Sequence, residues 1–83
     1  MMLWNHTEIK SKLFNILEKI APEIDPNTVD LDANISYEFE IDSMDFLRMM
    51  VEIKEVFDID IPESDYGKIT SLHKLVDYLQ RFI

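Results

Sequence analysis

Three stretches of the chain repeat apolar residues at the spacing of an amphipathic helix, and this pattern constrains the fold most. Strand-like alternation is weak, since Ile59 and Ile61 alternate with acids only briefly before Pro62. A chain of 83 residues is long enough for one small domain. We therefore predict a single all-α domain over residues 1–83. The apolar faces are Ile9, Leu13, Ile16, Leu17 and Ile20; Phe46, Met49, Met50, Ile53, Val56 and Phe57; and Leu72, Leu75, Val76, Leu79 and Phe82.

The first helix has recognisable boundaries. Asn5 and Glu8 stand at the spacing of a capping box, which predicts the helix start. Pro22 disfavours helical geometry in the residue before it, so the helix should end there. Leu3 and Trp4 are expected to fold back onto the helix as a hydrophobic staple.

The remaining segments predict connections and one short turn. Residues 22–42 show no sustained period, so they form a long connection whose apolar residues must be held against the core, with short helical turns. Residues 64–68 suit a short helical turn, with Gly67 near its end, and Ser71 suits the cap of the last helix. The expected fold is a small four-helix bundle with a long first loop and a short third helix.

Charge is the main clue to partners. The formal net charge is -9, and residues 23–65 hold 14 acids and two bases, whereas the remainder holds three acids and six bases. Such a charge disfavours nucleic acid and anionic membranes and favours a basic protein partner, although solubility alone also explains it. The chain has no cysteine and no apolar run near the roughly 18 residues of a membrane span. We expect a cytoplasmic protein without stable membrane insertion.

The stretch of residues 39–47 delivers Ser43 to the start of the second long helix. A phosphate esterified to this serine would sit at the helix N-terminus, where unpaired N–H groups and the helix dipole stabilise negative charge. The alternative is that Asp42 or Ser43 only caps the helix, with Asp45 completing a box-like arrangement.

A second apolar stripe follows Ser43 on the same helix. Met44, Leu47 and Val51 project away from the predicted core face, and Arg48 and Glu55 flank them. The stripe suits a small hydrophobic docking strip with charged edges. The alternative is that the long connection packs over it.

Several short motifs follow one another along the chain: Asp42-Ser43-Met44-Asp45, Phe57, Ile61-Pro62-Glu63, Thr70-Ser71-Leu72 and Tyr78-Leu79. Together they resemble the motifs of an acyl carrier protein. The resemblance covers almost the whole chain, and the short serine motif gains specificity from the downstream motifs and the acidic composition.

The resemblance implies that Ser43 carries a 4'-phosphopantetheine group transferred from coenzyme A, with Asp42 as the second cofactor-binding residue. The thiol of this cofactor would hold acyl intermediates as thioesters, while chemistry belongs to the partner enzymes of fatty acid, special lipid or polyketide synthesis. The chain itself would not be an enzyme. Its implied partners are a phosphopantetheinyl transferase and acyl-activating, condensing or acyltransferase enzymes with basic docking surfaces. The carrier itself is expected to be a monomer.

The resemblance also assigns roles to particular residues. The second long helix would be the recognition element, and the growing acyl chain would enter the bundle, although ordinary core packing is an alternative for each pocket residue. The implied partner contacts are Asp42, Met44, Asp45, Leu47, Val51 and Glu55, with Arg48 at the edge of the strip; the implied acyl pocket is Met50, Ile53, Ile61, Ile69 and Leu75.

The chain departs from the family pattern at four positions. Glu40 replaces a common glycine, so we expect a slightly different turn. Arg48 and Lys54 replace frequent acids, and Phe46 is bulkier than usual. These departures favour a dedicated carrier for a special lipid or secondary metabolite. A stand-alone peptidyl or aminoacyl carrier, or an unmodified acidic helical adaptor using the same face, remains an alternative.

Metal and histidine chemistry have little support in the sequence. Asp30, Asp32 and Asn34 suit the first positions of a calcium loop, but the required glycine and final glutamate are missing. His6 and His73 lack nearby ligands at metal-binding spacing and are not sequence-linked to Ser43. We predict no metal site and no catalytic residue.

Overall fold

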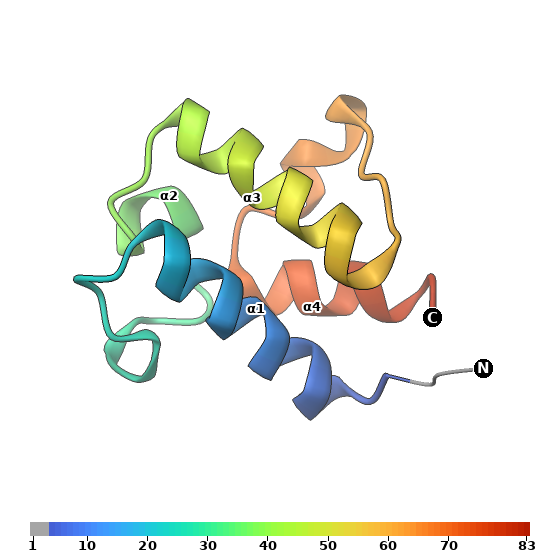
Figure 1. Ribbon diagram of the computed structural model, residues 1–83, viewed down its shortest axis with the longest axis horizontal. Helices are drawn as coiled ribbons and strands as arrows, with labels where there is room; N and C mark the ends of the chain where they lie inside the picture. Colours follow the sequence, from blue (N-terminus) through green and yellow to red (C-terminus); the bar gives the residue numbers. More distant parts are fainter. Residues whose placement is uncertain (1–3) are drawn as a thin grey trace.

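The computed structural model describes residues 4–83 and contains helices joined by irregular segments (Figure 1). The expected all-α fold is confirmed: the β pairing found in the described residues is one isolated antiparallel bridge between Asn34 and Ser71. Helix α1 packs against both α3 and α4. The elements are α1 (His6–Ile20), η1 (Pro26–Thr28), α2 (Ile35–Glu38), α3 (Ser43–Phe57), η2 (Glu63–Lys68) and α4 (Leu72–Gln80), with η marking 3₁₀ turns.

The boundaries of α1 follow the expected chemistry. Asn5 accepts a hydrogen bond from the backbone N–H of Glu8, and the Glu8 carboxylate accepts one from the backbone N–H of Asn5, at 2.8 and 3.3 Å. This is the predicted capping box. The helix ends before Pro22, where the N–H of Ala21 donates to the carbonyl of Leu17. Its buried residues are Ile9, Leu13, Ile16 and Leu17.

The segment before α1 reaches two other helices. Leu3, half of the predicted staple, lies outside the described residues. The Trp4 ring packs edge-on against Phe57, the last residue of α3, with ring centroids 5.3 Å apart. Its carbonyl accepts a hydrogen bond from the Gln80 side chain in α4. Trp4 therefore ties the beginning of the chain to the ends of α3 and α4.

The predicted core face of α3 is confirmed, with a partly exposed edge. Met49, Ile53 and Phe57 are buried. The other predicted face residues, Phe46, Met50 and Val56, are half-buried and pack against the core.

The long connection contains the expected short helical turns, η1 and α2. Two backbone bonds fasten it to the beginning of α4: the Ile35 N–H donates to Thr70 at 2.8 Å, and the His73 N–H donates to Leu31 at 3.1 Å. These bonds place α2 below the start of α3 (Figure 1). The buried residues here are Ile35, Phe39 and Ile41.

The last helix is shorter than its apolar pattern predicts. Ser71 caps α4 as expected, since its hydroxyl accepts from the Lys74 N–H at 3.1 Å. The helix ends at Gln80, and Phe82 is 59% exposed, so its predicted place in the core is wrong. Tyr78 is buried instead, and its ring contacts that of Phe82. After Gln80 the backbone tightens into a turn in which the Phe82 N–H donates to the carbonyl of Leu79.

No helix within residues 4–83 is long and apolar enough to cross a membrane.

Candidate functional site

Ser43 is the first residue of α3 and is exposed. The cap is Asp42: its carboxylate accepts from the Asp45 N–H at 2.9 Å, and its carbonyl accepts from the Phe46 N–H. The Ser43 hydroxyl is therefore not needed to cap the helix. Of the two capping interpretations, the structure selects Asp42.

The position of Ser43 suits a covalently attached phosphate. The first N–H groups of a helix have no partner within the helix, and the dipole of α3, which is 15 residues long, favours negative charge at this end. A phosphodiester on an exposed first-turn hydroxyl would meet these N–H groups without unfolding any local structure.

The apolar stripe of α3 is exposed along its length. Met44, Leu47 and Val51 are 74%, 50% and 58% exposed, and we call these three residues the docking strip. Packing of the long connection over the strip is therefore not found. Arg48 and Glu55 are also exposed. Of the remaining predicted contacts, Asp42 is exposed and Asp45 is half-buried.

A groove of about 370 Å³ lies beside Ser43, and we call it the Ser43 groove. Its floor contains Ile35 and Ile41, which are 2% and 7% exposed. One wall is an aromatic pair, Phe46 and Tyr66, whose ring centroids are 5.1 Å apart in an edge-to-face arrangement. The full lining is Asn34, Ile35, Ser36, Ile41, Asp42, Ser43, Phe46, Tyr66 and Thr70.

Sequence reasoning missed most of this lining. The missed side chains come from the start of α2, from η2 and from Thr70 before α4, so a helical period within one segment does not reveal them. Another unforeseen feature is Tyr37 of α2, which is 78% exposed. Only the serine motif pointed to this region.

The predicted acyl-pocket residues lie elsewhere, in the hydrophobic core. Ile53, Ile69 and Leu75 are fully buried, Ile61 is 5% exposed, and Met50 is half-buried. The Ser43 groove does not include any of these five residues. Phe46 and Tyr66, which line the groove, pack against the core cluster that contains the four buried residues of this set.

The turn that leads to Ser43 contains a strained residue. Glu40 has φ of 53°, in the left-handed region, where glycine carries no steric penalty. The Glu40 N–H donates to Tyr37 and the Ile41 N–H donates to Ser36, which is the hydrogen-bond pattern of a Schellman motif ending α2. The expectation of a slightly different turn stays a prediction. Glu40 itself adopts the conformation that glycine favours, at a cost in strain.

The turn η2, which supplies Tyr66, is anchored to α4. The Tyr78 hydroxyl donates to the Asp65 carboxylate at 2.6 Å, and Lys68 pairs with Asp65 at 3.3 Å. The hydrogen bond from Tyr78, aided by Lys68, holds the pKa of Asp65 below its ordinary value. Burial, with the same hydrogen bond, raises the pKa of Tyr78 to about 12. These interactions hold η2, and with it Tyr66 of the aromatic wall, against α4.

The residues weighed for metal binding have structural roles. The side chain of Asp30 accepts from the Asp32 N–H, and Asn34 caps α2. The His73 ring pairs with Asp32 at 2.5 Å. Within residues 4–83, no group of three or more His, Cys, Asp or Glu side chains could hold a metal ion. His6 is paired separately, with Asp77 at 3.3 Å.

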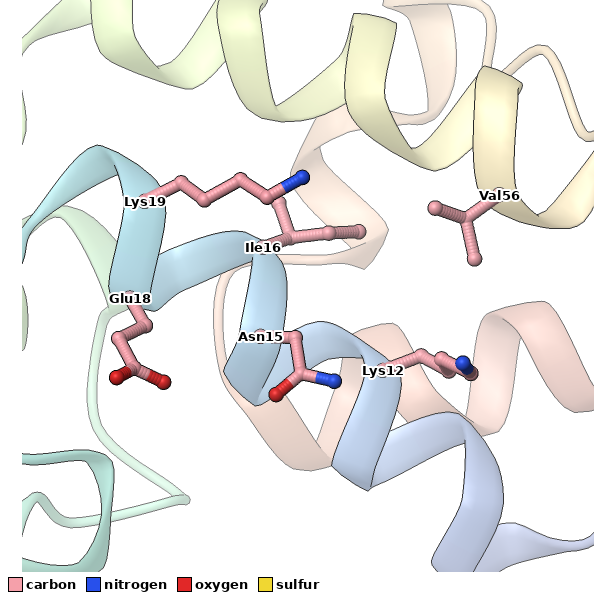
Figure 2. A pocket seen from close by; sticks show the side chains of 6 residues that line it. All are labelled: Lys12, Asn15, Ile16, Glu18, Lys19 and Val56. Atoms are coloured by element: carbon pink, nitrogen blue, oxygen red, sulfur yellow. The ribbon is translucent and has the colours of Figure 1, made fainter.

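A second hollow, of about 540 Å³, lies between α1 and α3. Figure 2 shows Lys12, Ile16 and Lys19 extending from α1 toward Val56 of α3. Val56 stands 13 positions after the serine, or about 20 Å along the helix at about 1.5 Å per residue. This hollow is therefore not beside Ser43.

Comparison with known proteins identifies the family. The profile described as "Phosphopantetheine attachment site" matches residues 11–79. The "Acyl carrier protein" of Amoebophilus asiaticus is 34% identical over 76 residues, which cover 90% of this chain and 92% of that protein. The chain belongs to the acyl carrier protein family.

Other acyl carrier proteins show the same likeness. That of Campylobacter concisus is 29% identical over 66 residues, covering 80% of this chain and 83% of that protein. The mitochondrial acyl carrier protein of Neurospora crassa is 29% identical over 72 residues, covering 87% of this chain and 54% of that protein. Members of this family are carriers rather than catalysts, and membership implies covalently attached 4'-phosphopantetheine and interaction with modifying and biosynthetic enzymes.

Proposed function

We propose that the protein holds acyl intermediates as thioesters on 4'-phosphopantetheine attached to Ser43 and presents them to enzymes of fatty acid, special lipid or polyketide synthesis. The observation that carries the proposal is that Ser43 is exposed in the first turn of α3. Its hydroxyl is not needed as the helix cap, because the Asp42 carboxylate has that role. On this proposal, residues 1–83 form one domain that acts as a monomeric cytoplasmic carrier and performs no catalysis itself.

The loading step has a definite chemistry. The Ser43 oxygen attacks the phosphorus that bears the pantetheine arm in coenzyme A, and the pyrophosphate bond to that phosphorus breaks. Adenosine 3',5'-bisphosphate leaves, and the hydroxyl proton passes to a base of the transferase. The new phosphodiester keeps one negative charge, which the N-terminal end of α3 stabilises.

The docking strip suits the recognition of these enzymes. Three exposed apolar side chains on one helix, Met44, Leu47 and Val51, supply surface that a partner can bury. The surrounding acids favour partners with basic surfaces, and Arg48 modifies that complementarity at one edge. We therefore place partner binding on the exposed side of α3, from Asp42 to Glu55.

Intact-mass measurement tests the attachment. The purified protein is incubated with coenzyme A and a phosphopantetheinyl transferase, beside Ser43→Ala and the matched control Ser64→Ala, which alters another exposed serine. The wild type and the control should each gain one phosphopantetheine, and Ser43→Ala should gain none. Loading of Ser43→Ala, or no loading of a folded wild type by several transferases, would refute the proposal.

A further inference from the structure

The aromatic pair joins α3 to η2 at one side of the Ser43 groove. Phe46 comes from α3, one helical turn after the serine, and Tyr66 comes from η2. Both rings are half-buried, and both pack against the core while lining the groove. The pair therefore lies at the boundary between the groove and the core.

The pair is held in place from both elements. Tyr66 lies next to Asp65, which the Tyr78 hydroxyl of α4 and the Lys68 ammonium hold. Phe46 donates its N–H to the carbonyl of Asp42 within the first turn of α3. These bonds fix the two backbone segments from which the rings project.

The two sides of this wall differ. Behind it, Ile53, Ile69 and Leu75 are fully buried in a packed core, so a guest there must displace side chains. In front of it, the groove already offers about 370 Å³, within the range of about 300–1,000 Å³ typical of ligand pockets.

The rim of the groove suits the amide groups of a pantetheine arm. The side-chain oxygen of Asn34 accepts from the Tyr37 N–H, which leaves the Asn34 amino group to donate to a ligand. Ser36 and Thr70 add hydroxyl groups that can donate or accept. Ile35 and Ile41 supply an apolar floor for an acyl group.

We infer that the Ser43 groove is the cargo site of this carrier, that it takes short acyl groups, and that the Phe46–Tyr66 pair keeps them out of the core. This inference rests on the proposed attachment to Ser43. It differs from the expectation, based on the family resemblance, that an acyl chain enters the bundle. The bulky Phe46, a departure from the family pattern, becomes a determinant of cargo length.

The test follows backbone amide signals of the loaded carrier by ¹H–¹⁵N NMR. Butanoyl and dodecanoyl groups are placed on the Ser43 arm, and intact mass verifies each loading. Compared with the arm without cargo, butanoyl should shift the signals of Ile35, Ile41 and Thr70. Neither cargo should shift those of Ile53 and Leu75, and the midpoint of thermal unfolding should not rise with chain length.

Three variants test the role of the rings. Phe46→Ala should let dodecanoyl shift the Ile53 and Leu75 signals, and Phe46→Leu, which keeps more volume, should do so less. Tyr66→Phe preserves the ring contact and should behave like the wild type. Each variant is compared with its own form without cargo, so a general loss of stability cancels.

The outcomes separate two failures. A loaded wild type whose core signals shift more as the chain lengthens, or a Phe46→Ala protein whose core stays unaffected by dodecanoyl, overturns this inference alone. Absence of the added mass on a folded wild type overturns the attachment to Ser43, and the inference fails with it.

Discussion

Replacing Glu40 by glycine should stabilise the protein. Glu40 has φ of 53°, and a left-handed conformation costs a residue with a side chain about 1–2 kcal/mol. Glycine avoids that cost, but its unfolded chain is more flexible, which returns about 0.4–1 kcal/mol. We expect the Glu40→Gly protein to be more stable than Glu40→Ala by about 1 kcal/mol, because alanine removes the charge and keeps the strain.

Thermal and urea unfolding of the two variants measure this difference. For a domain of this size, about 1 kcal/mol corresponds to roughly 4–8 °C in Tm. The control is the same pair at Glu18, an exposed residue inside α1, where glycine should instead be less stable than alanine by about 0.5–1 kcal/mol. Equal stability of the two Glu40 variants, or the same sign at both positions, would refute the strain argument.

Further predictions concern the docking strip, the Tyr78 hydrogen bond and the glycine. Leu47→Asp should lower the kcat/KM of loading by the transferase at least tenfold, which corresponds to ~1.4 kcal/mol. The control Phe82→Asp changes another exposed apolar residue and should leave kcat/KM unchanged. Equal losses in the two variants would contradict a docking role for Leu47. Tyr78→Phe should lower the free energy of unfolding at pH 7. This loss should shrink as pH falls through the lowered pKa of Asp65, where the carboxylate takes up a proton, and as pH rises toward the Tyr78 pKa of about 12, where the hydroxyl loses one. A difference in the free energy of unfolding that stays constant across urea titrations from acidic pH to about pH 12 would contradict this. Gly67→Ala should raise stability by about 0.4–1 kcal/mol in urea unfolding, because Gly67 lacks a positive φ and an added Cβ has no neighbour within 4 Å; a lower stability would count against that explanation.

Local chemistry made the helices predictable. The spacing of apolar residues gave the buried faces of α1 and α3, and side-chain caps at Asn5, Asp42 and Ser71 marked three helix starts. The position of Ser43 at the start of a helix followed from the same signals. These features depend on residues a few positions apart, which a single sequence displays directly.

The features missed by sequence reasoning depend on contacts between distant segments. Tyr66 and Ile35 meet in one groove only after η2 and α2 have packed near α3. The end of α4 was misjudged because Phe82 continues the apolar period after the helix has stopped. The position of the single glycine did not reveal the left-handed turn residue either. Gly67 has no positive φ, whereas Glu40 adopts the left-handed conformation that favours glycine.

Two backbone hydrogen bonds join residues 31–35, which lie at one side of the Ser43 groove, to the beginning of α4. Residues 31–35 and 70–73 should therefore exchange their amide hydrogens with solvent as one cooperative unit, because neither segment can open without breaking bonds to the other. Fraying that spreads inward from Arg81 would loosen α2 before it reached α3. Opening of the last helix should therefore also disturb Asn34 and Ile35, which line the groove beside Ser43.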